Sequence, residues 1–133
     1  ALPILFQATL CSVAGASEVF DGGFVTYAAS AKEQLLGVPV ETVRQYGVVS
    51  KQTAEAMASG CQQKMGVDVG LSFTGVAGPD DLEGHPAGTV WLGLAIKGRP
   101  VESHLLRLPG QTRQFVRQQS VQEGMRLTYN ALR

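Results

Sequence analysis

The sequence has no excess of charge of either sign, because 11 lysines and arginines balance 11 aspartates and glutamates. A balanced chain has no overall attraction to a phosphate backbone or an anionic membrane, so we expect neither nucleic acid nor a membrane as a partner. Cysteine is also scarce: Cys11 and Cys61 are too few for the bridged scaffold of a small secreted protein. We expect both thiols to be reduced and buried, and the protein to be cytoplasmic.

Long apolar runs are missing as well. No stretch approaches the roughly 20 residues that cross a bilayer, and the start "ALPILFQATL" lacks the basic flank of a signal peptide. A chain of 133 residues has the length of one ordinary domain, so we expect residues 1–133 to form a single domain. The chain begins with Ala rather than Met, and we expect its N-terminal edge to be incomplete.

The first half of the chain alternates helical and extended patterns. Apolar spacing predicts a helix that starts near Phe6 and stops near Val13. The run "GGFVTYAA" is typical of a short strand, and the helix "SAKEQLLG" follows it directly and ends at Gly37. A short helix ending at Gly47 comes next, and Ser50 is the expected N-cap of a longer helix.

The second half predicts a sheet and a final helix. The nearly continuous apolar run "VDVGLSFTG" indicates a central strand covered on both faces, and "GTVWLGLAIKG" with "VESHLLRL" indicates an antiparallel hairpin. Residues 111–133 predict a surface helix with Val121, Met125 and Leu132 on one stripe. These patterns predict an α/β fold, a three-layer α/β/α sandwich with a mixed central sheet.

The loop "FTGVAGPDDLEGHPAGTVW" leaves the carboxyl end of the predicted central strand, where open α/β sheets bind ligands. Gly75 and Gly78 would let backbone N–H groups approach an anion such as phosphate, and Thr74 adds a hydroxyl. The alternative is a long turn that only joins two strands. His85 has no second His, Cys or carboxylate at metal spacing, so we expect no metal here.

Tyr27 and Lys32 form a second candidate site. Tyr27 lies at the end of a predicted strand and Lys32 in the first turns of the next helix, so both could converge beyond the sheet edge. A lysine there could be a base if burial or nearby positive charge lowered its pKa from about 10.4 toward roughly 7 to 8. The alternative is an ordinary solvated lysine.

A third candidate is the arginine cluster in "RLPGQTRQFVRQQ". Arg113 and Arg117 are four residues apart and would face the same way at the start of the last helix, with Arg107 nearby. Together with the positive end of the helix dipole they would form an anion site. The alternative is a solvated charged face.

Four segments resemble one known family. In order along the chain they are "GASEVFDGGFVTYAASAKEQLLGV", "YGVVS", "FTGVAGPDDLEGHPAGTVWLGLA" and "LPGQTRQFVR". They resemble the family formed by the C-terminal domain of the CinA competence-damage proteins and the nicotinamide-nucleotide amidase PncC. The resemblance runs from about Leu5 to the C-terminus.

This resemblance implies hydrolysis of nicotinamide mononucleotide to nicotinic acid mononucleotide and ammonia, with no metal and no cofactor, by a homo-oligomer. The family uses a serine nucleophile with a lysine and a tyrosine, which match Lys32 and Tyr27 here. By the same resemblance, Thr74, Gly75 and Gly78 would line the nucleotide pocket. Arg117 and Arg113 would face the phosphate.

The chain departs from the family pattern in three places. The family serine lies in a segment A-E-S-x-T-G-G, and its aligned position falls ahead of Ala1. Ala29 and Ser30 replace a common Asn and an acid, and "GQTR" carries one residue more than "GDR". Three hypotheses follow: an amidase whose serine segment lies upstream, a nucleotide-binding domain without chemistry, and an interaction module. We favour the amidase.

Overall fold

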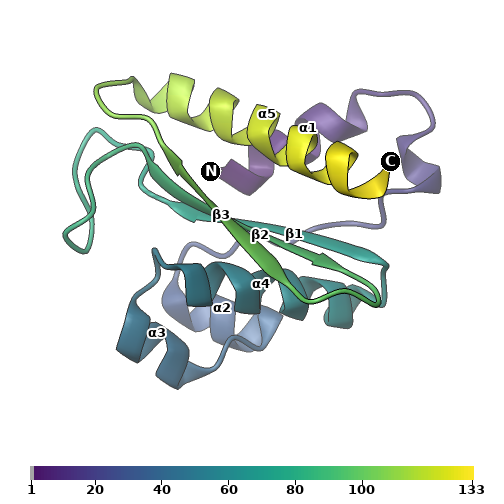
Figure 1. The fold of residues 1–133 in the computed structure, drawn as a ribbon, viewed down its shortest axis with the longest axis horizontal. Helices are drawn as coiled ribbons and strands as arrows, with labels where there is room; N and C mark the ends of the chain where they lie inside the picture. Colours follow the sequence, from purple (N-terminus) through teal and green to yellow (C-terminus); the bar gives the residue numbers. More distant parts are fainter. Residues whose placement is uncertain (1) are drawn as a thin grey trace.

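The structure is a computed structural model that describes residues 2–133. The helices are α1 (Leu2–Cys11), α2 (Ala29–Leu36), α3 (Val40–Tyr46), α4 (Lys51–Met65) and α5 (Arg113–Leu132), with a 3₁₀ turn η1 (Ala16–Glu18) after α1. The strands are β1 (Val69–Gly75), β2 (Thr89–Ile96) and β3 (Glu102–Arg107). Helices α1 and α5 cover one face of the sheet, and α2, α3 and α4 lie on the other (Figure 1). The predicted three-layer α/β fold is therefore confirmed.

The sheet differs from the prediction in two respects. Its strand order is β1-β2-β3, so β2 is central and β1, the predicted central strand, lies at an edge of the described sheet. Both pairs are antiparallel, with Gly75 opposite Val90 and Leu92 opposite His104, so the described sheet is antiparallel rather than mixed. The predicted hairpin of β2 and β3 is confirmed.

The expected strand around Phe24–Tyr27 is also absent from the described residues. This segment is irregular, and the carbonyl oxygen of Thr26 accepts a hydrogen bond from the amine of Lys32 instead of a strand partner. Phe24 packs against the cluster of Leu36, Val38 and Met57, which lies between α2 and α4. Side-chain contacts with α2 and α4 thus replace the ladder that would have made the sheet mixed.

Helix boundaries follow the local signals. Helix α2 ends at Gly37 and α3 at Gly47, as predicted, and both glycines have positive φ. The hydroxyl of Ser50 caps α4 by accepting a hydrogen bond from the N–H of Thr53 at 3.1 Å. On α5, Val121 is buried but Leu132 is 56% exposed, so the predicted stripe is wrong at its C-terminal end. The buried face of α5 consists of Val116, Ser120, Val121, Gly124 and Leu127.

Two layers of packing hold the sheet. Large side chains fill the space below α1 and α5, where Phe73, Leu92 and Val116 are buried and the ring of Phe6 lies 5.4 Å from that of Phe73. The other face meets α4 through small residues. A Cβ on Gly93 would lie 2.3 Å from the carbonyl oxygen of Ala54, so no side chain fits between strand and helix there.

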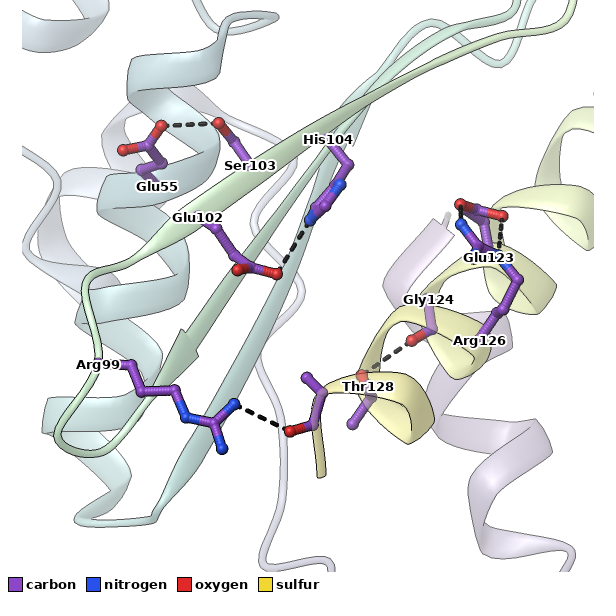
Figure 2. Close-up of polar contacts among 10 residues, drawn as sticks. Glu55, Arg99, Glu102, Ser103, His104, Glu123, Gly124, Arg126 and Thr128 are labelled. Carbon is purple, nitrogen blue, oxygen red and sulfur yellow. Dashed lines mark hydrogen bonds and ion pairs between the residues drawn. The ribbon is translucent and has the colours of Figure 1, made fainter. Parts of the chain in front are cut away.

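Strand β3 is tied to both layers by polar side chains (Figure 2). Ser103 donates a hydrogen bond to Glu55 of α4 at 2.7 Å. In the turn before β3, Arg99 donates to the carbonyl oxygen of Ala131 in α5 at 2.9 Å. These bonds fix the free edge of the sheet between its two helical layers.

The cysteine prediction is half right. Both thiols are free, but Cys11 is exposed and Cys61 is only partly buried. Cys11 is the last residue of α1, whereas Cys61 packs beside Met57 on α4. Burial raises the pKa of the Cys61 thiol. In residues 2–133 no helix has the length and apolar character needed to cross a membrane.

Candidate functional site

Lys32 is a buried lysine in the layer formed by α2, α3 and α4. It lies in the first half of α2 and shares its buried face with Leu36, one turn further on. The side chain is only 5% exposed, and its amine donates to the carbonyl oxygen of Thr26 and reaches the Thr26 hydroxyl at 3.5 Å. Burial lowers the pKa of the Lys32 amine, and the carboxylate of Glu83 partly opposes this effect. The neutral amine is therefore available at lower pH than in an exposed lysine.

Tyr27 does not join Lys32 in the described residues. Its side chain is 70% exposed, whereas the neighbouring Thr26 is 8% exposed and contacts the amine. Thr26 was not among the residues expected from the sequence. The signal that could have identified it is the alternation of the extended run, in which Phe24 and Thr26 turn inward while Val25 and Tyr27 are exposed.

Thr74 lies at the end of β1, next to the loop before α4. It is 5% exposed, and its hydroxyl donates to the carbonyl oxygen of Val48 at 2.7 Å. This bond links the strand that leads into the predicted substrate loop to residues 47–50. Thr74 therefore has a structural partner in addition to its predicted role in the nucleotide pocket.

Steric contacts and backbone conformation explain why positions 75 and 78 are glycine. A Cβ on Gly75 would lie 2.6 Å from the carbonyl oxygen of Thr89, so close pairing with β2 already requires glycine. Gly78 has φ +96, which side chains rarely adopt. Its carbonyl oxygen accepts a hydrogen bond from the guanidinium of Arg113 at 2.7 Å. The structure thus brings Gly78 and Arg113 together.

Arg113 and Arg117 both lie on the first turns of α5. Arg117 donates to Gln114 at 3.3 Å, while its Nε is buried and has no hydrogen-bond partner among the described residues. A guanidinium N–H that is buried without a partner in the protein can donate a hydrogen bond to a bound anion. Arg107, at the end of β3, is exposed.

Glu83 is a second site residue that the sequence analysis did not single out. It lies in the loop between β1 and β2, and its carboxylate accepts hydrogen bonds from the N–H groups of Val48 and Val49 at 3.0 and 2.9 Å. The same carboxylate acts on the amine of Lys32. The signal was weak: a Glu before Gly in "LEG" indicates a turn, but not the residues that it contacts.

Two connected groups therefore surround the loop between β1 and β2. Glu83 and Thr74 both bond to residues 48–49, Lys32 is held at Thr26, and Gly78 joins Arg113 at the start of α5. A buried amine of lowered pKa can accept a proton, and the arginines can bind an anion. Across the part of the chain that the structure describes, no three His, Cys, Asp or Glu side chains are grouped to hold a metal ion.

The layered α/β fold matches solved structures of the CinA superfamily. A competence/damage inducible protein from Agrobacterium tumefaciens has a TM-score of 0.90 and 34% identity, with coverage of 95% of this chain and 77% of that one. A CinA superfamily protein from Enterobacter cloacae has a TM-score of 0.91 and 31% identity, with coverage of 96% and 75%. These likenesses define the class of protein.

The family model for the CinA C-terminal domain matches residues 5–132, and the chain belongs to that family. A relative from Limosilactobacillus fermentum, named as competence-damage inducible, is 99% identical over 129 residues, which are 97% of this chain and 31% of the relative. A relative of the same name from Limosilactobacillus reuteri is 60% identical over 130 residues, again 97% of this chain and 31% of the relative. The chain thus spans under a third of these relatives.

Proposed function

We propose that this CinA domain hydrolyses the carboxamide of nicotinamide mononucleotide to nicotinic acid mononucleotide and ammonia, without a metal or a cofactor. Membership of the family supports the reaction class. In the proposed chemistry, Lys32 removes the proton of a serine from the segment that precedes the first helix in the family. The serine oxygen bonds to the carboxamide carbon, the C–N bond breaks, and the amide nitrogen takes up the proton that Lys32 removed and leaves as ammonia. Water then hydrolyses the acyl-enzyme, which releases the acid and restores the serine.

The observation that carries this proposal is the buried amine of Lys32. An exposed lysine is almost fully protonated near neutral pH and is a poor base, whereas burial lowers the pKa of Lys32. The amine is also held in place by the carbonyl oxygen and hydroxyl of Thr26. Tyr27 follows Thr26 in the chain and remains the predicted second proton-transfer group.

The nucleotide is expected to lie along the loop between β1 and β2. Arg113 holds this loop at Gly78, so the start of α5 and the loop form one surface. The buried Nε of Arg117, unpaired among the described residues, supports a role for that guanidinium in binding the phosphate. Backbone N–H groups of the loop would stabilise the tetrahedral oxyanion.

The test is ammonia release from nicotinamide mononucleotide by the purified full-length gene product. Its intact mass, compared with the 14.1 kDa of this chain, shows how much polypeptide the assayed protein carries in addition to residues 1–133, and its encoding sequence shows whether that part includes the serine segment. We expect Lys32→Ala to abolish release while nucleotide affinity, measured by calorimetry, stays within about tenfold. The control is Lys97→Ala, which removes an exposed lysine from the β2–β3 turn and should leave the rate unchanged. Equal activity of Lys32→Ala and wild type would remove the lysine from the mechanism.

Nucleotide binding without chemistry is the second candidate function. The unpaired Nε of Arg117 favours it, because a phosphate site needs no serine. This function predicts calorimetric binding of nicotinamide mononucleotide that weakens in Arg117→Ala, together with no ammonia release from any preparation. Release that depends on Lys32 would exclude it.

A further inference from the structure

Strand β1 leaves one row of its backbone groups without a partner. Two hydrogen bonds continue the β1–β2 ladder at its ends: the N–H of Lys97 donates to Asp68 at 2.9 Å, and the N–H of Val76 donates to Thr89 at 2.8 Å. Hydrogen-bonded pairs alternate along an antiparallel ladder, so the even-numbered residues of β1 bond to β2. The odd-numbered residues turn their backbone groups to the outer edge of β1, where they have no hydrogen-bond partner among residues 2–133.

The two edges of the sheet differ in composition. Strand β3, at one edge, carries Glu102, His104 and Arg107. Charged side chains protect an edge strand because they oppose pairing with another strand. Strand β1, at the other edge, reads VGLSFTG and has neither a charge nor a proline. An unprotected apolar strand such as β1 is typical of the interior of a sheet.

Residues 22–27 run from the α1 layer to the α2 layer (Figure 1). A Cβ on Gly23 would lie 2.5 Å from the side chain of Gln7 in α1, and one on Gly22 would lie 3.0 Å from Met65 at the end of α4. Both helices pack against β1, so this segment bridges the two layers without a backbone hydrogen bond to β1 among the described residues. It would obstruct the sheet of a second copy, which favours a single strand of the same polypeptide as the partner of β1.

Helix α1 begins near the carboxyl end of β1. Leu2, the first residue of the helix, is 6% exposed and shares a buried cluster with Phe73 and Ala77. Phe6, one turn later, packs its ring on that of Phe73. Polypeptide that leads into α1 therefore arrives beside the end of β1. A strand that lies along β1 and then enters α1 must run parallel to β1.

The relatives contain polypeptide that could form such a strand. The matching family is a C-terminal domain, and this chain covers 31% of the Limosilactobacillus fermentum relative, so most of that protein precedes the matched residues. We infer that the outer edge of β1 binds a strand from the polypeptide ahead of residue 1, parallel to β1 and continuous with α1. This strand would add a parallel pair to the antiparallel sheet. The inference concerns where the polypeptide lies and does not depend on the proposed reaction.

Amide hydrogen exchange of the full-length gene product, resolved to single residues by NMR, tests the inference. In the ladder, the N–H groups of Leu71 and Phe73 point outward from β1, and those of Ser103 and Leu105 point outward from β3. The β3 amides are therefore the matched control. Relative to intrinsic rates, we expect exchange at Leu71 and Phe73 to be at least about 100-fold slower than at Ser103 and Leu105. Equal protection at the two edges would overturn the inference.

A second measurement identifies the strand. Nuclear Overhauser contacts should join the amide of Phe73 to residues ahead of Ala1 in the isotope-labelled full-length gene product. They should persist when the labelled protein is diluted with excess unlabelled protein, because the contact is intramolecular. Contacts that disappear on dilution would come from a second copy and would contradict the inference. So would contacts to any other segment, or a gene product with no polypeptide ahead of Ala1.

Discussion

The two faces of the sheet are packed by opposite means. Toward α1 and α5, large side chains such as Phe73 and Leu92 fill the space. Toward α4, backbone meets backbone: Cβ atoms on Gly93 and Gly70 would lie 2.3 and 2.4 Å from the carbonyl oxygens of Ala54 and Ala58. The first interface can adjust side-chain positions, whereas the second leaves no room for movement.

This difference bears on the site, because Lys32 and residues 47–50 belong to the α4 layer. Ser50 caps α4, and Ser72 of β1 donates to the carbonyl oxygen of Ala54 at 2.6 Å. The close contact of α4 with β1 and β2 therefore sets the distance between the loop before α4 and the strand that carries Thr74. We expect changes on this face to alter the surroundings of Lys32, and changes in the core below α1 and α5 to alter stability and leave Lys32 unaffected.

Leu92→Ala should have the largest effect. Leu92 is fully buried in the α1/α5 layer, so its truncation leaves a cavity and should lower the free energy of unfolding by about 2–5 kcal/mol. Urea denaturation measures the loss. At temperatures where the variant stays folded, the Lys32 pKa should be unchanged; a shifted Lys32 pKa would show that the two faces are not independent.

Gly93→Ala and Gly124→Ala form a matched pair, one on each face. The Cβ at position 93 meets the backbone of Ala54, which cannot move alone, and should cost about 1–3 kcal/mol of stability. The Cβ at position 124 would lie 2.7 Å from the Cζ atom of Phe73, the far end of a side chain, which can shift more easily than backbone, and alanine favours α5 by about 1 kcal/mol over glycine. Gly124→Ala should therefore be the milder variant. Equal losses would contradict the comparison.

Lys32→Met should change how stability depends on pH. The folded pKa of Lys32 is lowered, so the unfolded chain binds more protons between that pKa and the ordinary value of 10.5. Wild-type stability should therefore rise with pH across this window, as the penalty for the buried ammonium disappears. The methionine variant lacks this contribution. The urea midpoint of wild type, relative to that of Lys32→Met at the same pH, should therefore be higher near pH 10 than at neutral pH.

Arg126→Gln should have the smallest effect. Arg126 pairs with Glu123 one turn earlier on α5 (Figure 2), and this hydrogen bond lowers the pKa of the Glu123 carboxyl. A lowered carboxyl pKa stabilises the fold above the unfolded pKa, and this stabilisation is lost on acidification through the folded pKa. We expect no measurable change in the urea midpoint at neutral pH, because the pair is solvent-exposed. A large drop in the urea midpoint would show that this ion pair contributes more to stability than an exposed pair on α5 is expected to contribute.

Much of the fold was predictable because its signals are local. Gly37, Gly47 and Ser50 mark helix boundaries correctly, and the hairpin of β2 and β3 follows from its short turn. The sheet order was not predictable in the same way. An apolar run such as β1 indicates burial on both faces, but an edge strand covered by helices has the same pattern.

The residues of the candidate site also differ in whether local sequence signals could predict them. Lys32 could be proposed from its place in the helix after an extended segment, and its burial supports that choice. Glu83 could not, because its hydrogen bonds join residues 34 and 35 positions apart and depend on the packing of two loops. Thr26 could have been placed on an inward face from the alternation of residues 24–27, but its contact with the amine of Lys32 depends on tertiary packing.

The pH dependence of ammonia release from nicotinamide mononucleotide, in wild type and Lys32→Met, tests the central claim most directly. We predict that wild type is active near neutral pH, with an acidic limb of kcat/KM below the ordinary lysine pKa, because burial lowers the pKa of Lys32. Lys32→Met should release no ammonia above background at any pH. A Lys32→Met variant with the rate and the profile of wild type would show that the buried amine is not the base.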